Sequence, residues 1–187
     1  MMLESGAYGE RMARYLHLPV PPLYCKIGSA RFQLAVTRLH APTGFTEPTS
    51  HVPKEKAFSI HLHLRATSGG RLWLDGKLVP TPKRPSGGVT ILDLEQDPVA
   101  FFPNPIDVMQ FYIPRASLED FCYQNKLPFI DNLQWPYCGM DRVLTWALLF
   151  YLVCKGTNLH RSYSSTTSAW QCSRMLRTYT GARRRRR

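Results

Sequence analysis

Two histidines in the stretch "AFSIHLHLR", residues 57–65, are the first candidates for a chemical role. His61 and His63 stand two residues apart, so on a strand they share one face and could bind one metal ion. A catalytic zinc site takes three protein ligands, and no carboxylate follows His63 before Gly70. We therefore expect no metal, and we favour the interpretation that both histidines are polar residues on the solvated face of an amphipathic strand.

A cluster of acidic residues is the second candidate for chemistry. Asp93, Glu95 and Asp97 alternate at the end of a predicted strand, where acidic side chains are usually solvated. The sequence holds no GxSxG, P-loop or GxGxxG motif. We therefore expect no catalytic residue, no cofactor and no enzyme activity.

The net charge of +11 is concentrated near the C-terminus. Residues 156–187 hold eight arginines and no acidic residue, whereas the rest of the chain holds 16 basic and 13 acidic residues. The last five arginines are Arg183, Arg184, Arg185, Arg186 and Arg187. Such a run could neutralise phosphates without reading sequence, because base readout usually needs a recognition helix. We favour a solvated tail or linker, and weak nucleic-acid contact through these arginines stays open.

Cysteine usage and hydropathy indicate the compartment. The five cysteines are scattered and form no CxxC pair, which favours a reducing cytoplasm. The N-terminus has no apolar region typical of a signal peptide. The longest apolar run, residues 143–154, is shorter than the roughly 20 residues that span a bilayer. We expect a cytoplasmic protein without a membrane partner.

The elements that must position these residues change type along the chain. Apolar alternation predicts strands over residues 25–41, 57–65, 87–102 and 106–114, and Asp97-Pro98 is expected to break the third of these. Asp75-Gly76 predicts a hairpin within residues 71–85. Helical spacing follows in residues 115–126, and capping residues predict further helices over 141–154 and from Asn158 to Gly181. Strands followed by helices are typical of the α+β class.

Residues 71–134 carry a resemblance to a known family. They include "WLDG" at 73–76, a glycine-led strand with a "DL" pair at 88–94, and "FYIPR" at 111–115. This stretch resembles the N-terminal regulatory region of a group of AraC-type bacterial transcriptional regulators. The match extends less sharply over residues 26–182 and includes "RTYTGA" at 177–182.

The resemblance implies a division of the chain and a role. It implies a lead-in at 1–25, a cupin-like antiparallel β-sheet or barrel at about 26–114, a small helical dimerisation region at 115–182, and a basic tail or linker at 183–187. The usual role of such regions is to sense a small-molecule effector, although no effector-binding residue can be assigned here. In that family a helix-turn-helix domain follows this region, and it is missing here. We expect DNA contact only through that missing C-terminal domain.

The apolar segment 143–154 is too hydrophobic all round for an ordinary surface helix. It is buried in the core, buried in a dimer, or left exposed as an aggregation liability because a partner is absent. Trp146, Phe150 and Tyr151 are the candidate dimer contacts. The expected partner is a second copy or a full-length relative. Two alternatives remain open: a metal-dependent cupin-type enzyme using His61 and His63, and a small basic nucleic-acid-binding protein.

Overall fold

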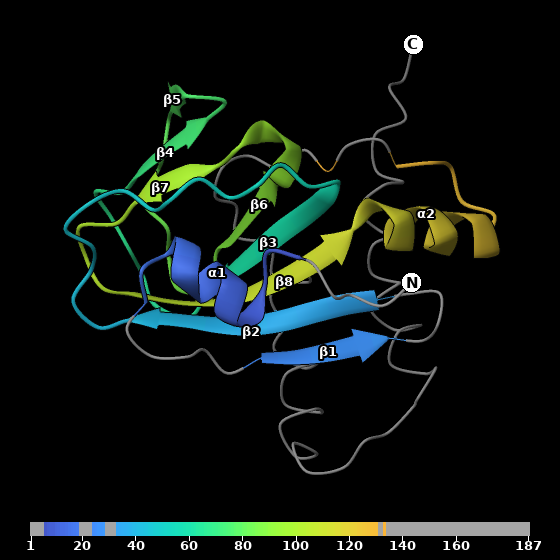
Figure 1. Cartoon of the computed structure of the whole chain (residues 1–187), viewed down its shortest axis with the longest axis horizontal. Helices are drawn as coiled ribbons and strands as arrows, with labels where there is room; N and C mark the ends of the chain where they lie inside the picture. The colour runs from blue at the N-terminus through green and yellow to red at the C-terminus, as the bar shows by residue number, and fades with distance from the viewer. Residues whose placement is uncertain (1–5, 19–23, 29–32, 131–132, 134–187) are drawn as a thin grey trace.

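The structure is a computed structural model that describes residues 6–18, 24–28, 33–130 and 133 (Figure 1). Its strands form two antiparallel sheets, and the larger has the order β1-β2-β8-β3-β6. The strands of this sheet are β1 (Tyr24–Gly28), β2 (Gln33–Ala41), β8 (Ile106–Pro114), β3 (Ala57–His63) and β6 (Val89–Asp93). The smaller sheet is β5 (Lys77–Val79), β4 (Arg71–Leu74) and β7 (Val99–Phe101). The helices are α1 (Gly9–Tyr15), the 3-10 helix η1 (Leu94–Gln96) and α2 (Arg115–Gln124).

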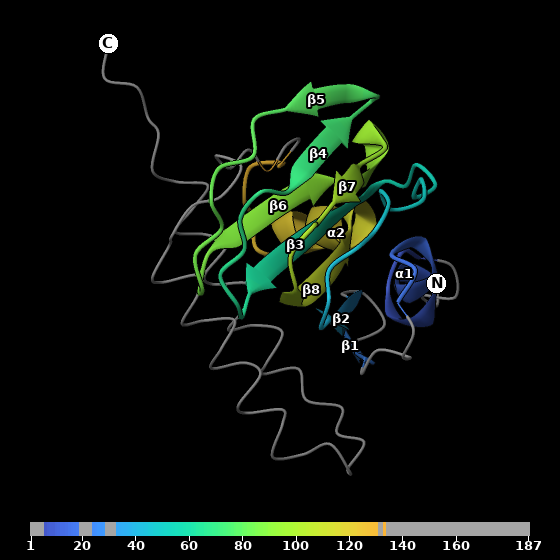
Figure 2. The same cartoon turned by 90° about the vertical axis from the view of Figure 1, so that its left-hand side faces the viewer.

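Both faces of the large sheet are buried. On one face, aliphatic side chains such as Ile60 and Leu62 form a core with Phe121 and Cys122 of α2. On the other face, Leu39 and Val108 belong to a second core that includes Met12 of α1. Figure 1 shows α1 lying across the sheet over β2, and Figure 2 shows β4, β5 and β7 grouped above β6. The large sheet is therefore the middle layer of the described structure.

Polar side chains form a row across the α1-facing side of the large sheet. The register pairs Thr37 with Gln110, Gln110 with His61, and His61 with Thr90. Thr37, Gln110 and Thr90 are buried. Because buried polar groups need hydrogen-bond partners, this row restricts what can pack on that face.

The predicted α+β class is confirmed, and so are two of its local elements. Asp75 and Gly76 join β4 to β5 with positive φ values of 47° and 73°, as a tight hairpin turn requires. The helix predicted over residues 115–126 is α2.

Three boundaries differ from the sequence prediction. The single strand expected over 25–41 is instead two antiparallel strands, β1 and β2, in which Gly28 pairs with Gln33. The strand expected over 87–102 has the predicted break at Asp97-Pro98, where Asp97 adopts a left-handed φ of 46°, but its first part already ends at Asp93 because η1 follows. After the break, β7 joins the other sheet. The lead-in contains α1, whose Met12 and Ala13 are buried.

Several predicted features lie outside the described residues. They are the helices over 141–154 and beyond Asn158, the candidate dimer contacts Trp146, Phe150 and Tyr151, and the arginines at 183–187. Among the residues that the structure does describe, no helix has the length and apolar character needed to cross a membrane.

The polar row fastens the N-terminal segment to the sheet. Gln110 donates through Nε2 to the carbonyl oxygen of Ala7 and to Oγ of Ser59, both at 2.9 Å. The backbone N–H of Gly9 donates to Oγ1 of Thr37 at 2.9 Å. The segment that leads into α1 therefore supplies backbone partners for side chains that would otherwise be buried without them.

The substitution Gln110→Leu removes the Nε2 donor, so the carbonyl oxygen of Ala7 and Oγ of Ser59 each lose a hydrogen bond. We expect the free energy of unfolding to fall by about 1–3 kcal/mol, the usual cost of a buried polar group that loses its partner. Urea denaturation measures this loss. The control is Gln124→Leu at the exposed end of α2, where we expect a change within about 0.5 kcal/mol. Equal effects of the two substitutions would contradict the role given to Gln110.

Candidate functional site

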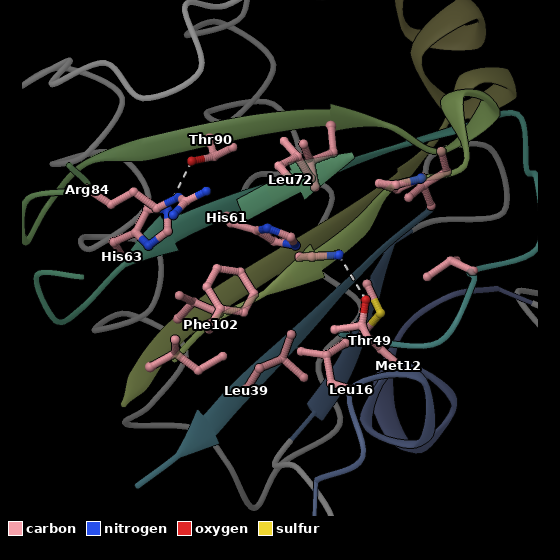
Figure 3. A pocket seen from close by; sticks show the side chains of 17 residues that line it. Met12, Leu16, Leu39, Thr49, His61, His63, Leu72, Arg84, Thr90 and Phe102 are labelled. Carbon is pink, nitrogen blue, oxygen red and sulfur yellow. Dashed lines mark hydrogen bonds between the residues drawn. The ribbon is translucent and has the colours of Figure 1, made fainter. Parts of the chain in front are cut away.

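A cavity of about 60 Å³ lies between the large sheet, the small sheet and α1. By the same measure a water needs about 10–15 Å³, so the cavity has room for roughly four to six waters. Figure 3 shows apolar side chains along one side of it: Met12 of α1, Leu16 directly after α1, and Leu39 of β2. His63 and Arg84 lie together at the other end.

The two histidines of the sequence analysis both line this cavity. The expected alternation along β3 is present, but the prediction that His61 and His63 face solvent is wrong. His63 is 3% exposed and His61 is partly exposed. The reason is tertiary: Leu72 of β4 and Ala100 of β7 line the same cavity and cover that face of β3.

Each imidazole has a hydroxyl neighbour on the sheet. Nε2 of His61 lies 2.9 Å from Oγ of Ser59, and Nε2 of His63 lies 2.9 Å from Oγ1 of Thr90. Nδ1 of His63 is buried and has no hydrogen-bond partner among the described residues. His63 therefore retains one ring nitrogen for a further contact.

Arg84 comes from the segment between β5 and β6 and is held by contacts with distant residues. Its backbone exchanges two hydrogen bonds with Thr67, at 2.8 and 2.9 Å. Its guanidinium lies over the Phe102 ring, 5.3 Å from the centroid. Gly70 leaves room for it, because a Cβ there would stand 2.9 Å from Nη1. The position of this charge is thus set by packing, and Arg84 is only 4% exposed.

Burial and the nearby cation keep the histidines neutral. Desolvation, and then the charge of Arg84, lower the pKa of His61 to about 4. Desolvation, followed by His61 and Arg84, lowers the pKa of His63 to about 3. Each imidazole at neutral pH therefore carries one ring N–H and one acceptor nitrogen.

The cavity does not fit a metal centre. Within the residues that the structure describes, no cluster of three or more His, Cys, Asp or Glu side chains is placed to hold an ion. Arg84 carries a permanent positive charge in the same cavity and opposes the binding of a cation.

The acidic cluster of the sequence analysis lies elsewhere and has structural contacts. Asp93 and Glu95 form ion pairs with Arg115 at the start of α2, at 2.5 and 2.9 Å. Asp97 pairs with His51 at 2.9 Å. None of the three acids lines the cavity. They connect β6 and its following turn to neighbouring segments.

Sequence reasoning missed Arg84 and Thr90. Thr90 could have been found from the register, since it stands opposite His61 on β6. Arg84 lies in the stretch "TPKRPSGG", where no periodicity marks one basic residue as buried and its neighbour Lys83 as exposed.

Comparison with protein families and with curated protein sequences found no match. Among solved structures, similar ones include a cupin superfamily protein from Desulfitobacterium hafniense, with 13% identity, a TM-score of 0.35, and coverage of 50% of this chain and 77% of that one. A Cupin 2 conserved barrel domain protein from Salinispora arenicola has 15% identity, a TM-score of 0.33, and coverage of 55% and 84%. An RmlC-like cupin protein from Desulfovibrio desulfuricans has 12% identity, a TM-score of 0.32, and coverage of 60% and 92%.

The lowered histidine pKa values predict a loss of stability in acid. Below the unfolded-state pKa of about 6.5, the unfolded chain binds protons that the folded chain does not. The free energy of unfolding should therefore fall as pH falls from about 6.5 toward the folded-state values of about 4 for His61 and about 3 for His63. The steepest slope for each histidine is about 1.4 kcal/mol per pH unit.

Urea denaturation between pH 7.5 and pH 4.5 measures this slope. The double variant His61→Asn/His63→Asn should lose clearly less stability over that interval than the parent protein. His40→Asn removes a histidine from an exposed position of β2 and should leave the slope of the parent protein in place. A double variant with the parent's slope would show that these two histidines are not buried in neutral form.

Proposed function

We propose that the chain is the regulatory, effector-sensing domain of an AraC-type transcriptional regulator, acts in the cytoplasm, and binds a small organic molecule in the cavity. The observation that carries the proposal is the cavity itself, which has apolar walls and converging polar groups at one end. Small-molecule sites in proteins have this composition. The AraC-type resemblance of residues 71–134 supplies the regulatory role.

The contents of the cavity favour binding over catalysis. Its described lining holds no Asp or Glu, so it offers no carboxylate acid–base pair and no carboxylate to orient a histidine beside a hydroxyl such as that of Thr90. Nε2 of each histidine is already within hydrogen-bond distance of a hydroxyl on the sheet. These groups can hold and orient a ligand, and we propose no reaction for the site.

In this proposal the chain acts through a second subunit. Residues 115–182 pair with a second copy or with a full-length relative, and Trp146, Phe150 and Tyr151 make the contacts.

Co-expression tests this pairing. An affinity-tagged full-length AraC-type relative should retain the chain through purification. The triple variant Trp146→Ala/Phe150→Ala/Tyr151→Ala is the matched control and should not be retained. A parent chain that is not retained would refute the pairing.

Filling the cavity tests ligand binding directly. Ala100→Leu adds a branched side chain to the cavity wall and should abolish stabilisation by any effector that binds there. Ala66→Leu makes the same change at an exposed position and is the control. An effector present at a concentration of 100 times its Kd adds about 2.7 kcal/mol to the free energy of unfolding. We expect this gain to raise the Tm of the parent protein by about 5 °C or more.

Thermal denaturation against a panel of small metabolites makes this measurement. A compound that stabilises the parent and Ala66→Leu, but not Ala100→Leu, supports the proposal. Compounds that stabilise all three proteins equally bind elsewhere. A panel without any such selective compound would count against a sensor role.

A further inference from the structure

The described lining of the cavity has a net positive charge. Arg84 is its permanent cation, His61 and His63 are its other titratable groups, and no Asp or Glu belongs to it. Arg84 is 4% exposed, so bulk water screens its charge weakly. An ion pair is stronger in such a place than at the surface, because the local dielectric constant is lower.

The guanidinium is pre-positioned for recognition. The two backbone hydrogen bonds with Thr67 anchor the residue, and its guanidinium lies over the Phe102 ring in space that Gly70 leaves open. A guanidinium presents a planar fork of N–H groups that matches the two oxygens of a carboxylate. Because Arg84 is already ordered, binding loses little side-chain entropy.

The histidines add donors beside this charge. Nδ1 of His63 is buried without a partner among the described residues, and His63 lies next to Arg84 at one end of the cavity (Figure 3). Burial, and then the nearby charges, disfavour the charged form of both imidazoles. An anion beside Arg84 would oppose only the smaller of these effects, so each imidazole stays neutral near pH 7 and can offer the anion one ring N–H.

The rest of the cavity limits the ligand's body. Its walls are aliphatic along Met12, Leu16 and Leu39, and its volume of about 60 Å³ corresponds to roughly four to six waters. From the charge, the donors and this size, and building on the proposed sensor function, we propose that the effector is a short-chain organic carboxylate. Its carboxylate pairs with Arg84 and contacts His63, and its short apolar chain lies along the aliphatic wall.

Butyrate and butyramide form the decisive pair of probes, because they share a carbon chain and differ in charge. Isothermal titration calorimetry should show that butyrate binds the parent protein at least about tenfold more tightly than butyramide. Arg84→Gln should weaken butyrate binding at least about tenfold, the low end of a charge-assisted contact. Lys83→Gln removes the same charge from the adjacent exposed residue and should leave the affinity within about twofold of the parent's.

The contrast between butyrate and butyramide in the parent protein keeps the test valid even if Arg84→Gln does not fold.

The outcomes separate this inference from the sensor proposal. Equal affinity for butyrate and butyramide, or a butyrate affinity unchanged in folded Arg84→Gln, overturns the carboxylate assignment. If neutral compounds alone bind in a manner sensitive to Ala100→Leu, the sensor role stands and the anionic effector is refuted. If neither these probes nor any compound of the panel binds, both proposals fail.

Discussion

A row of polar side chains on a buried sheet face is the constraint on which much of this structure depends. Thr37, Gln110, His61 and Thr90 lie side by side across four strands, in a layer that water does not reach freely. Each polar group in such a layer needs a partner, since an unsatisfied one costs the fold free energy. At one end of the row, the backbone of the segment leading into α1 supplies partners. At the other end, the row borders the cavity.

The opposite face of the same sheet obeys a simpler rule. The buried side chains of its core are aliphatic or aromatic apart from Cys122, and α2 packs against them without any hydrogen-bonding requirement. Arg115 joins this layer to the end of β6 through its ion pairs with Asp93 and Glu95, and its guanidinium lies 4.3 Å from the centroid of Phe58. One face of the sheet is therefore specified by packing, whereas the other is specified by hydrogen bonds and by the space they leave.

That difference explains why the candidate site lies where it does. Room remains beside His61 and His63, between the polar row and the apolar side chains that face it. Arg84 is held at the same end by a backbone bridge and an aromatic ring. The site thus combines a fixed cation, neutral donors and an aliphatic wall, which are the parts needed to recognise a small amphipathic ligand.

The sequence by itself determined the local elements and the grouping of side chains along them. The period-2 pattern of β3 placed His61 and His63 on one face, Asp75-Gly76 predicted the β4–β5 hairpin, and the change of period predicted α2. Local patterns record which residues share a face, because they follow from the geometry of one strand or helix. They do not record what covers that face. Only the tertiary structure decided that the histidines are enclosed and that Arg84 joins them, because both facts depend on contacts between residues far apart in the chain.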